Sequence, residues 1–131
     1  MEKKKTFIEV QQKVRDMETK QVEVFKHQTE AMWYELSTFS KIVYQDAQNQ
    51  TVEVKWMPNQ SHLEIKYGQN RFMFDINHST SMLYATAQGQ IPLVVVTKQL
   101  TIRQNRLSVT YQLLSGEEVM GQYEFQLIYR R

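Results

Sequence analysis

The sequence contains no cysteine, which excludes disulfides, thiolate metal ligands and a cysteine nucleophile. Disulfides belong to oxidising compartments, so a chain without cysteine fits the reducing cytoplasm, which is the location we expect. The basic N-terminus, MEKKKTFIEV, is not followed by an apolar stretch of signal-peptide length. The longest apolar run, IPLVVV at 91–96, is far too short to cross a bilayer as a helix, and we expect no membrane association.

The charge of the chain is nearly balanced and points to no particular partner. Sixteen Lys and Arg residues stand against fourteen Asp and Glu residues, which gives a net charge of +2. The stretch 76–116 lacks acidic residues and holds three cations, Lys98, Arg103 and Arg106. A nucleic-acid binder is expected to carry a denser basic stripe. We therefore expect no nucleic-acid partner, and we interpret Arg103 and Arg106 as charges that keep a hairpin tip soluble.

Apolar and polar residues alternate along most of the chain after residue 50, which is the pattern of half-buried strands. In the stretch VEVKWMPNQSHLEIKY, at 52–67, Val52, Val54 and Trp56 share one side, and the alternation resumes beyond Pro58. Turn-forming residues separate such runs at 58–59, 68–70, 77–79, 88–89, 104–105 and 115–116. The last of these predicts a tight hairpin, with Gly116 at positive φ. Short strands separated in this way predict an antiparallel barrel or sandwich.

The first 45 residues carry two competing patterns. Apolar residues recur at helical spacing at Phe7, Val10, Val14, Met17 and Val24. The same segment also alternates as two strands joined by a turn near Glu18-Thr19. No glycine or proline occurs before Pro58, so the residues alone leave a helix and a strand hairpin about equally open.

A set of spaced Tyr, Thr and Gly residues resembles a known family. The run YATAQGQIPLVVVT and the run VTYQLLSGEEVMGQYEFQL contain these residues, which are Tyr84, Thr86, Gly89, Thr97, Tyr111 and Gly121. The segments HQTEAMWY and KIVYQD lie upstream. With these runs, most of the chain, from Thr6 to Tyr129, resembles the YwiB-like family of small bacterial proteins of unknown function.

The resemblance implies an all-β fold, a single antiparallel up-and-down calycin-like (lipocalin-like) β-barrel of about eight to ten strands. It would span residues 1–131 as one domain, with 1–5 as a frayed tail, and it would make the N-terminal segment a strand hairpin. One departure is visible: where the family tends to have a glycine after the stretch that Thr29 matches, this chain has Glu30-Ala31. A bend there must be made without glycine. The family supplies no established active-site residues.

A barrel of this size has an interior that side chains can fill or that can hold one small ligand. Alternation sends eight aromatic side chains inward, namely Trp56, Tyr67, Phe72, Phe74, Tyr84, Tyr111, Tyr123 and Phe125. These form either a plain core or an aromatic-lined pocket, and alternating aromatic residues favour the core. If the barrel is hollow, the candidate ligand-binding residues are Trp56, Tyr67, Tyr84, Thr86, Tyr111 and Tyr123.

No residue pattern indicates catalysis, a metal or a cofactor. The three histidines are isolated from one another at His27, His62 and His78. In the segment NHSTS, His78 stands beside two serines, but neighbours in a turn seldom have the geometry that nucleophilic catalysis needs. The sequence also lacks a nucleophile elbow. We expect no catalytic residues, no metal and no cofactor, and therefore a protein that is not an enzyme.

Two functional hypotheses remain. The leading one is a binding module that takes a small apolar ligand into the barrel; it rests on analogy with the fold and on aromatic content. The alternative is an interaction protein with a filled barrel that acts through its outer surface or as a homodimer. Trp33 and Tyr34 are adjacent, so alternation sends one inward and one outward. An exposed Trp33 would be a partner or dimer contact, or it would cap an open end of the barrel.

Overall fold

The computed structural model describes residues 2–57 and 62–130, and this part of the chain folds into ten β-strands. Within it, no helix is long and apolar enough to cross a membrane. The strands are β1 (Glu2–Asp16), β2 (Val22–Glu35), β3 (Ser40–Gln45), β4 (Thr51–Trp56), β5 (His62–Tyr67), β6 (Asn70–Asp75), β7 (Thr80–Thr86), β8 (Gly89–Arg103), β9 (Arg106–Ser115) and β10 (Glu118–Tyr129).

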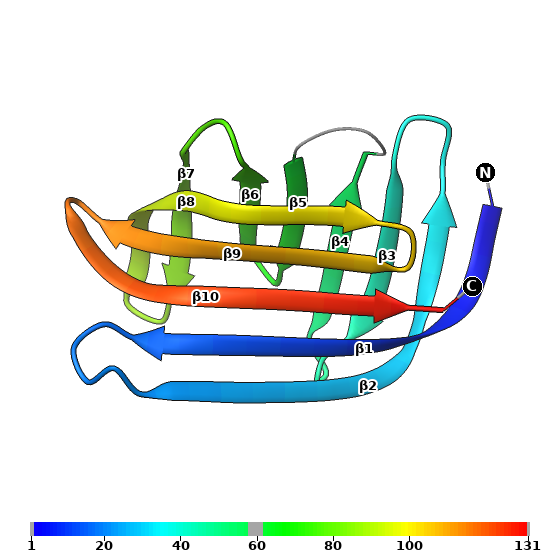
Figure 1. Cartoon of the computed structure of the whole chain (residues 1–131), viewed down its shortest axis with the longest axis horizontal. Coiled ribbons are helices and arrows are strands. Elements are labelled where there is room, and N and C mark those ends of the chain that lie inside the picture. Colours follow the sequence, from blue (N-terminus) through cyan, green and yellow to red (C-terminus); the bar gives the residue numbers. More distant parts are fainter. Residues whose placement is uncertain (1, 58–61, 131) are drawn as a thin grey trace.

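All strand pairs are antiparallel, and the order across the sheet is β6-β5-β4-β3-β2-β1-β10-β9-β8-β7. In Figure 1, most of β8, β9, β10, β1 and β2 runs across the view, while β3 to β7 stand at a steep angle behind these strands. The single sheet is therefore folded over itself into two layers that cross nearly orthogonally. The prediction of an all-β, up-and-down antiparallel barrel is confirmed, with ten strands in a barrel that is nearly closed.

The N-terminal segment is a strand hairpin, which resolves the ambiguity of its sequence. β1 pairs with β2 from Glu2 to Arg15 and with β10 from Ile8 to Asp16. The connecting turn is made without glycine. The Asp16 carboxylate accepts hydrogen bonds from the amides of Glu18 and Thr19 at 2.8 and 3.1 Å, and Lys20 adopts a φ of 63°. Pairing of β1 on both edges outweighs the helical spacing of its apolar residues.

The expectation of a frayed tail over residues 1–5 is wrong for the described residues 2–5, which belong to β1. Lys3 pairs with Tyr34, and Lys4 pairs with Trp33. The ammonium groups of Lys3 and Lys4 lie 5.6 and 5.7 Å from the ring centres of Tyr34 and Trp33, respectively. Backbone pairing and these cation–π contacts order a segment whose charge alone would leave it in solvent.

The bend expected near Thr29 occurs without glycine. β2 pairs with β3 only from Met32 to Glu35, so the two strands part at Ala31, and Figure 1 shows β1 and β2 curving together into the second layer. Ala31 is 5 % exposed and lies opposite the buried Thr6, whose hydroxyl donates to the carbonyl of Arg130. A small side chain on the inner face therefore accommodates the bend.

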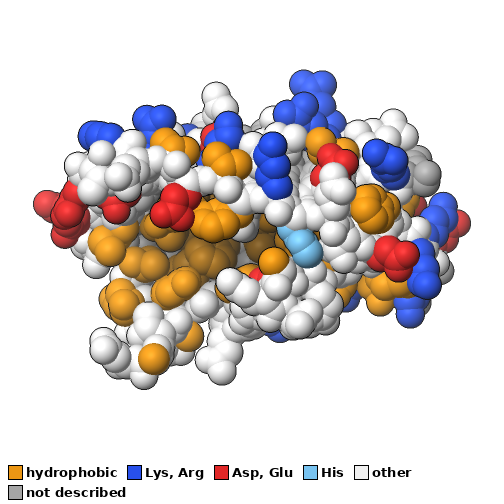
Figure 2. All heavy atoms as spheres, turned by 90° about the horizontal axis from the view of Figure 1, so that it is seen from below, with side chains coloured by type: hydrophobic (Ala, Val, Ile, Leu, Met, Phe, Trp, Pro, Cys, Tyr) orange, Lys and Arg blue, Asp and Glu red, His pale blue; other side chains and the backbone are white. Residues whose placement is uncertain are grey.

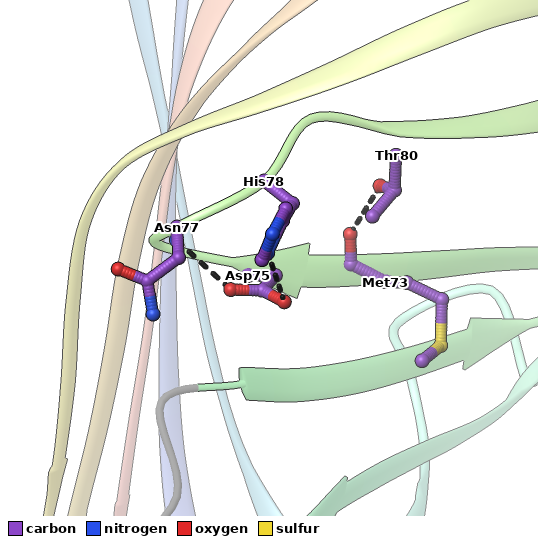
Figure 3. A network of polar contacts seen from close by, with 5 residues as sticks. All are labelled: Met73, Asp75, Asn77, His78 and Thr80. Carbon is purple, nitrogen blue, oxygen red and sulfur yellow. Dashed lines mark hydrogen bonds and ion pairs between the residues drawn. The ribbon is translucent and has the colours of Figure 1, made fainter.

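Side chains, rather than a continuous ladder, join the edge strands β6 and β7. The amide of Ala85 donates to Oδ1 of the buried Asn70 at 2.7 Å. The Thr80 hydroxyl donates to the carbonyl of Met73 at 2.6 Å (Figure 3). These bonds satisfy backbone groups that a neighbouring strand would otherwise pair, so the two edge strands are held together without a ladder.

The interpretation of the NHSTS segment as a loop holds for its first three residues, and Thr80 begins β7. His78 faces a carboxylate, because its Nδ1 lies 3.3 Å from Oδ2 of Asp75 (Figure 3). The amide of Asn77 donates to the other oxygen of Asp75 at 2.9 Å. The Asn77 amide and His78 hold the pKa of Asp75 below its usual range despite some desolvation. The arrangement is that of a turn.

One half of the barrel is filled by a packed core. Trp33 and Trp56 both pack against Tyr129, with ring centres 5.4 and 5.7 Å from its ring. Trp33 is therefore inward and does not form an exposed contact surface. Fully buried side chains surround these rings and continue the core, and they include Ile8, Ile42, Val54, Leu63, Leu107, Val109 and Leu127.

Candidate ligand cavity

The other half of the barrel is hollow. A cavity of about 790 Å³ opens to solvent there, and every one of the ten strands contributes lining residues. Figure 2 shows the hollow from below, with hydrophobic side chains both inside it and around its rim. The volume lies within the range of about 300 to 1,000 Å³ that is typical of small-molecule sites. The barrel is thus filled at one end and open at the other.

Packed rings form one wall of the cavity. The rings of Phe72 and Phe74 are nearly parallel, with centres 6.1 Å apart. Tyr111 lies 4.5 Å from Phe74 and 5.2 Å from Tyr123, and Tyr84 lies 6.4 Å from Phe72. Aliphatic side chains and one Met supply much of the remaining wall, at Val10, Val24, Val52, Ile65, Ile91, Leu93, Leu113 and Met120.

Five tyrosines line the cavity, and most of their hydroxyl groups are unpaired by protein. Within residues 2–57 and 62–130, the hydroxyls of Tyr44, Tyr84, Tyr111 and Tyr123 make no hydrogen bond to the chain. The hydroxyl of Tyr67 donates to Asp46. The unpaired hydroxyls are donors and acceptors that water or a ligand must satisfy.

Burial raises the pKa of several of these phenols. Desolvation is the largest cause that raises the pKa of Tyr111, followed by the neighbouring phenols of Tyr123 and Tyr84. Desolvation also raises the pKa of Tyr44, and the nearby carboxylate of Asp46 adds to this effect. The pKa of Tyr123 is raised in the same direction, first by desolvation and then by Tyr84. At neutral pH the cavity therefore presents neutral hydrogen-bond donors.

The charged or titratable residues among the other lining groups are Lys26, His27 and Asp46. Oδ1 of Asp46 accepts hydrogen bonds from the amides of Gln48 and Gln50, both at 2.9 Å, so the carboxylate is held by its own turn. Nε2 of His27 lies 3.0 Å from the carbonyl of Gln45 and links β2 to β3 beyond the point where their backbone pairing ends. In the described part of the chain, no cluster of three or more His, Cys, Asp or Glu could hold a metal ion.

Five of the six residues predicted from the sequence line this cavity, namely Tyr67, Tyr84, Thr86, Tyr111 and Tyr123. The sixth, Trp56, does not line the cavity, because it is buried in the filled half against Tyr129. Alternation predicts which face of a strand a side chain occupies, but it does not predict how far along the barrel axis that side chain lies. Thr86 lines the cavity, but its hydroxyl is bonded within the adjacent turn. The hydroxyl donates to the carbonyl of Gly89 at 2.7 Å and accepts from the amide of Gln88.

Several lining residues were missed by the sequence reasoning. Tyr44 lies on the inner face of the short strand β3 beside Ile42, and the alternation of KIVYQ is the signal that could have found it. Gln12 and His27 line the cavity from β1 and β2, whose strand character the residues alone left open. Arg103 and Arg106 pair across the β8–β9 turn, where both are exposed and neither lines the cavity.

The ten antiparallel strands, the up-and-down order and the nearly closed barrel define a calycin-like fold. The chain is similar to the crystal structure of the ywiB protein from Bacillus subtilis, with a TM-score of 0.78 and 16% sequence identity over 98% of this chain and 92% of that chain. At that identity the likeness shows the fold. Residues 8–127 match the family described as a domain of unknown function, DUF1934, and the chain belongs to this family. No curated protein matches the chain.

Proposed function

We propose that the protein is a non-enzymatic binding module that takes a small, largely apolar ligand into the hollow half of the barrel. The observation that carries the proposal is the cavity of about 790 Å³, most of whose lining is aromatic or aliphatic. Apolar side chains continue onto the rim, where Val24, Phe25, Ile91 and Met120 are each more than 40% exposed. An apolar ligand would cover this surface and gain about 25 cal/mol for each Å² removed from water.

The proposal includes a cytoplasmic location, which fits the cysteine-free sequence. It includes no metal, cofactor, nucleic acid or membrane partner. The tyrosine hydroxyls that face the cavity give the ligand directional contacts, whereas the apolar wall supplies most of the binding free energy.

Binding of a neutral, apolar fluorescent dye, Nile red, tests the proposal. The folded protein is expected to bind the dye with a stoichiometry of about one, as a barrel with room for one small ligand requires. Leu113→Trp places a bulky ring in the cavity wall and is expected to abolish binding, because Leu113 lines the cavity. Gln112→Trp is the matched control, since the adjacent residue does not line the cavity and should leave binding intact. Equal binding by both variants would refute the proposal.

A second candidate function, self-association, is favoured by the part of β2 at the cavity rim that has no β3 partner. Val22, Val24 and Phe25 are 46, 49 and 52 % exposed, and β2 pairs with β3 only from Met32 to Glu35. An edge with exposed apolar side chains is a template for pairing with a second strand. Sedimentation over a range of concentrations tests it: a mass that rises to twice that of the chain and returns to one chain in Phe25→Lys supports a homodimer. A constant monomer mass excludes it.

A further inference from the structure

We infer that the ligand is a neutral, ring-containing molecule that presents an acceptor oxygen to the hydroxyls of Tyr84, Tyr111 and Tyr123 and packs its ring on the aromatic wall. This inference rests on the proposed function, because it names the class of ligand for the same cavity. The inferred class of ligand does not include an aliphatic carboxylate such as a fatty acid.

Three unpaired hydroxyl groups lie near one another in the cavity. Tyr111 and Tyr123 are cross-strand partners on β9 and β10, with rings 5.2 Å apart and inclined by 20°. Tyr84 comes from β7, which β8 separates from β9 in the sheet, and its phenol influences the pKa of both. Donors that are removed from bulk water without a partner are costly, so a ligand that enters this region must offer an acceptor. A carbonyl oxygen, with two lone pairs, can accept from two of the three hydroxyls.

The surroundings of these phenols favour a neutral ligand over an anion. Apart from burial, the groups that raise the pKa of Tyr111 are the phenols of Tyr123 and Tyr84. The cationic lining residue, Lys26, is exposed on β2. A carboxylate placed beside Tyr111 would lose its hydration without gaining a counter-ion, and this cost is large. A neutral carbonyl loses less hydration and receives the same hydrogen bonds.

The wall next to these hydroxyls favours a ring. Phe72, Phe74 and Tyr111 form a contiguous set of rings. The ring centre of Phe72 lies 6.1 Å from that of Phe74 and 6.3 Å from that of Tyr111, and Phe74 and Tyr111 are 4.5 Å apart. Aromatic pairs at separations of about 4.5 to 7 Å gain stability beyond the area they bury. An aromatic ligand can extend this set of rings. A flexible alkyl chain gains binding free energy only from the apolar area that it buries, and it loses rotamer freedom on binding.

Two probes of equal ring content test the inference. Benzophenone and diphenylmethane differ only by the carbonyl, and decanoate supplies the aliphatic anion. The wild-type protein is expected to bind benzophenone about tenfold more tightly than diphenylmethane, and more tightly than decanoate. In the triple variant Tyr84→Phe/Tyr111→Phe/Tyr123→Phe, the two ring probes should bind with affinities within about twofold of each other. Tyr34→Phe is the matched control, because Tyr34 is outside the cavity and packs under Lys3 and Lys41.

The outcomes separate the inference from the proposed function. Equal wild-type affinity for benzophenone and diphenylmethane would overturn the inference and leave the cavity as a binding site, and so would tighter binding of decanoate. A preference for benzophenone that survives the triple variant would also overturn it. Failure of all three probes to bind would overturn both. If the triple variant does not fold, Tyr123→Phe alone supports the same comparison, because Tyr123 is only partly buried.

Discussion

The hydroxyl of Tyr123 lies against the backbone of Gly121, so close that a Cβ at position 121 would be 2.8 Å from the hydroxyl oxygen and 3.0 Å from Cζ. Gly121 follows a bulge in β10, where the pairing with β9 shifts between Val119 and Gly121. The absent side chain leaves the space in which the ring of Tyr123 lies. Gly121 therefore fixes the position of one of the hydroxyls that we assign to ligand binding.

Gly121→Ala is expected to displace the ring of Tyr123 and to destabilise the protein. Contacts under 3.0 Å must relax, and overpacking of this kind costs about 1 to 3 kcal/mol. The free energy of unfolding in urea measures the change. Binding of a cavity ligand should weaken as well, because the Tyr123 hydroxyl moves with the ring.

The double variant Gly121→Ala/Tyr123→Leu is the control for this clash. A leucine side chain at position 123 would be too short to reach the new Cβ, so Ala at position 121 should cost less than about 0.5 kcal/mol in the Tyr123→Leu background. Strict additivity of the two changes would contradict the proposed contact.

Asn70→Ala is expected to weaken the seam between β6 and β7. The substitution removes the oxygen that accepts from the Ala85 amide at 2.7 Å, and an unsatisfied amide costs about 1 to 3 kcal/mol. Hydrogen exchange of the Ala85 amide should accelerate, and urea unfolding should show the loss of stability. Gln69→Ala, in the exposed turn before β6, should leave both measurements unchanged. Unaltered exchange at Ala85 in Asn70→Ala would contradict the role of Asn70.

Two Leu→Ala substitutions distinguish the filled half of the barrel from the hollow half. Leu127 is fully buried in the core, so Leu127→Ala leaves a cavity and should cost about 3 to 5 kcal/mol. Leu113 lines the existing cavity, so the same change removes fewer contacts and should cost about 2 kcal/mol. Equal losses in urea unfolding would indicate that the cavity around Leu113 is filled in solution.

How much of this architecture the sequence predicts depends on the range of the interactions involved. The pleat of a strand sets a period of two, so alternation correctly placed Val52, Val54 and Trp56 on one buried face. The N-terminal segment was ambiguous, because its state is decided by pairing with β10, more than a hundred residues away in the chain. The prediction of a strand hairpin came from the family resemblance and not from the residue pattern.

The cavity was predicted only in part, for a geometric reason. Trp56 and Tyr67 are inward on neighbouring strands, yet Trp56 packs in the core, whereas Tyr67 lines the hollow. Depth along a barrel depends on the tilt and register of all its strands, which no local pattern contains. Thr86 was correctly placed on the cavity wall, but its hydroxyl is taken up by the adjacent turn.

Alkaline pH should destabilise the protein through its buried phenols. Burial raises the pKa of Tyr44, Tyr111 and Tyr123 above the ordinary value of 10.0. As pH rises through about 10, the unfolded state releases phenol protons first, so stability that is fully present below that pH is progressively lost above it. Urea unfolding between about pH 9 and pH 11 measures this loss. Tyr111→Phe should show a shallower decline than the wild-type protein, and parallel declines would contradict the burial of this phenol.

The most direct test of the binding barrel is the mass of the protein under native and denaturing conditions, before and after incubation with a cell extract. We expect a native mass that exceeds the chain by one small molecule, an excess that denaturation removes and that Leu113→Trp does not acquire. The released molecule should be neutral and contain a ring. A native mass equal to that of the bare chain in every sample would contradict the proposal that the hollow half of the barrel binds a ligand.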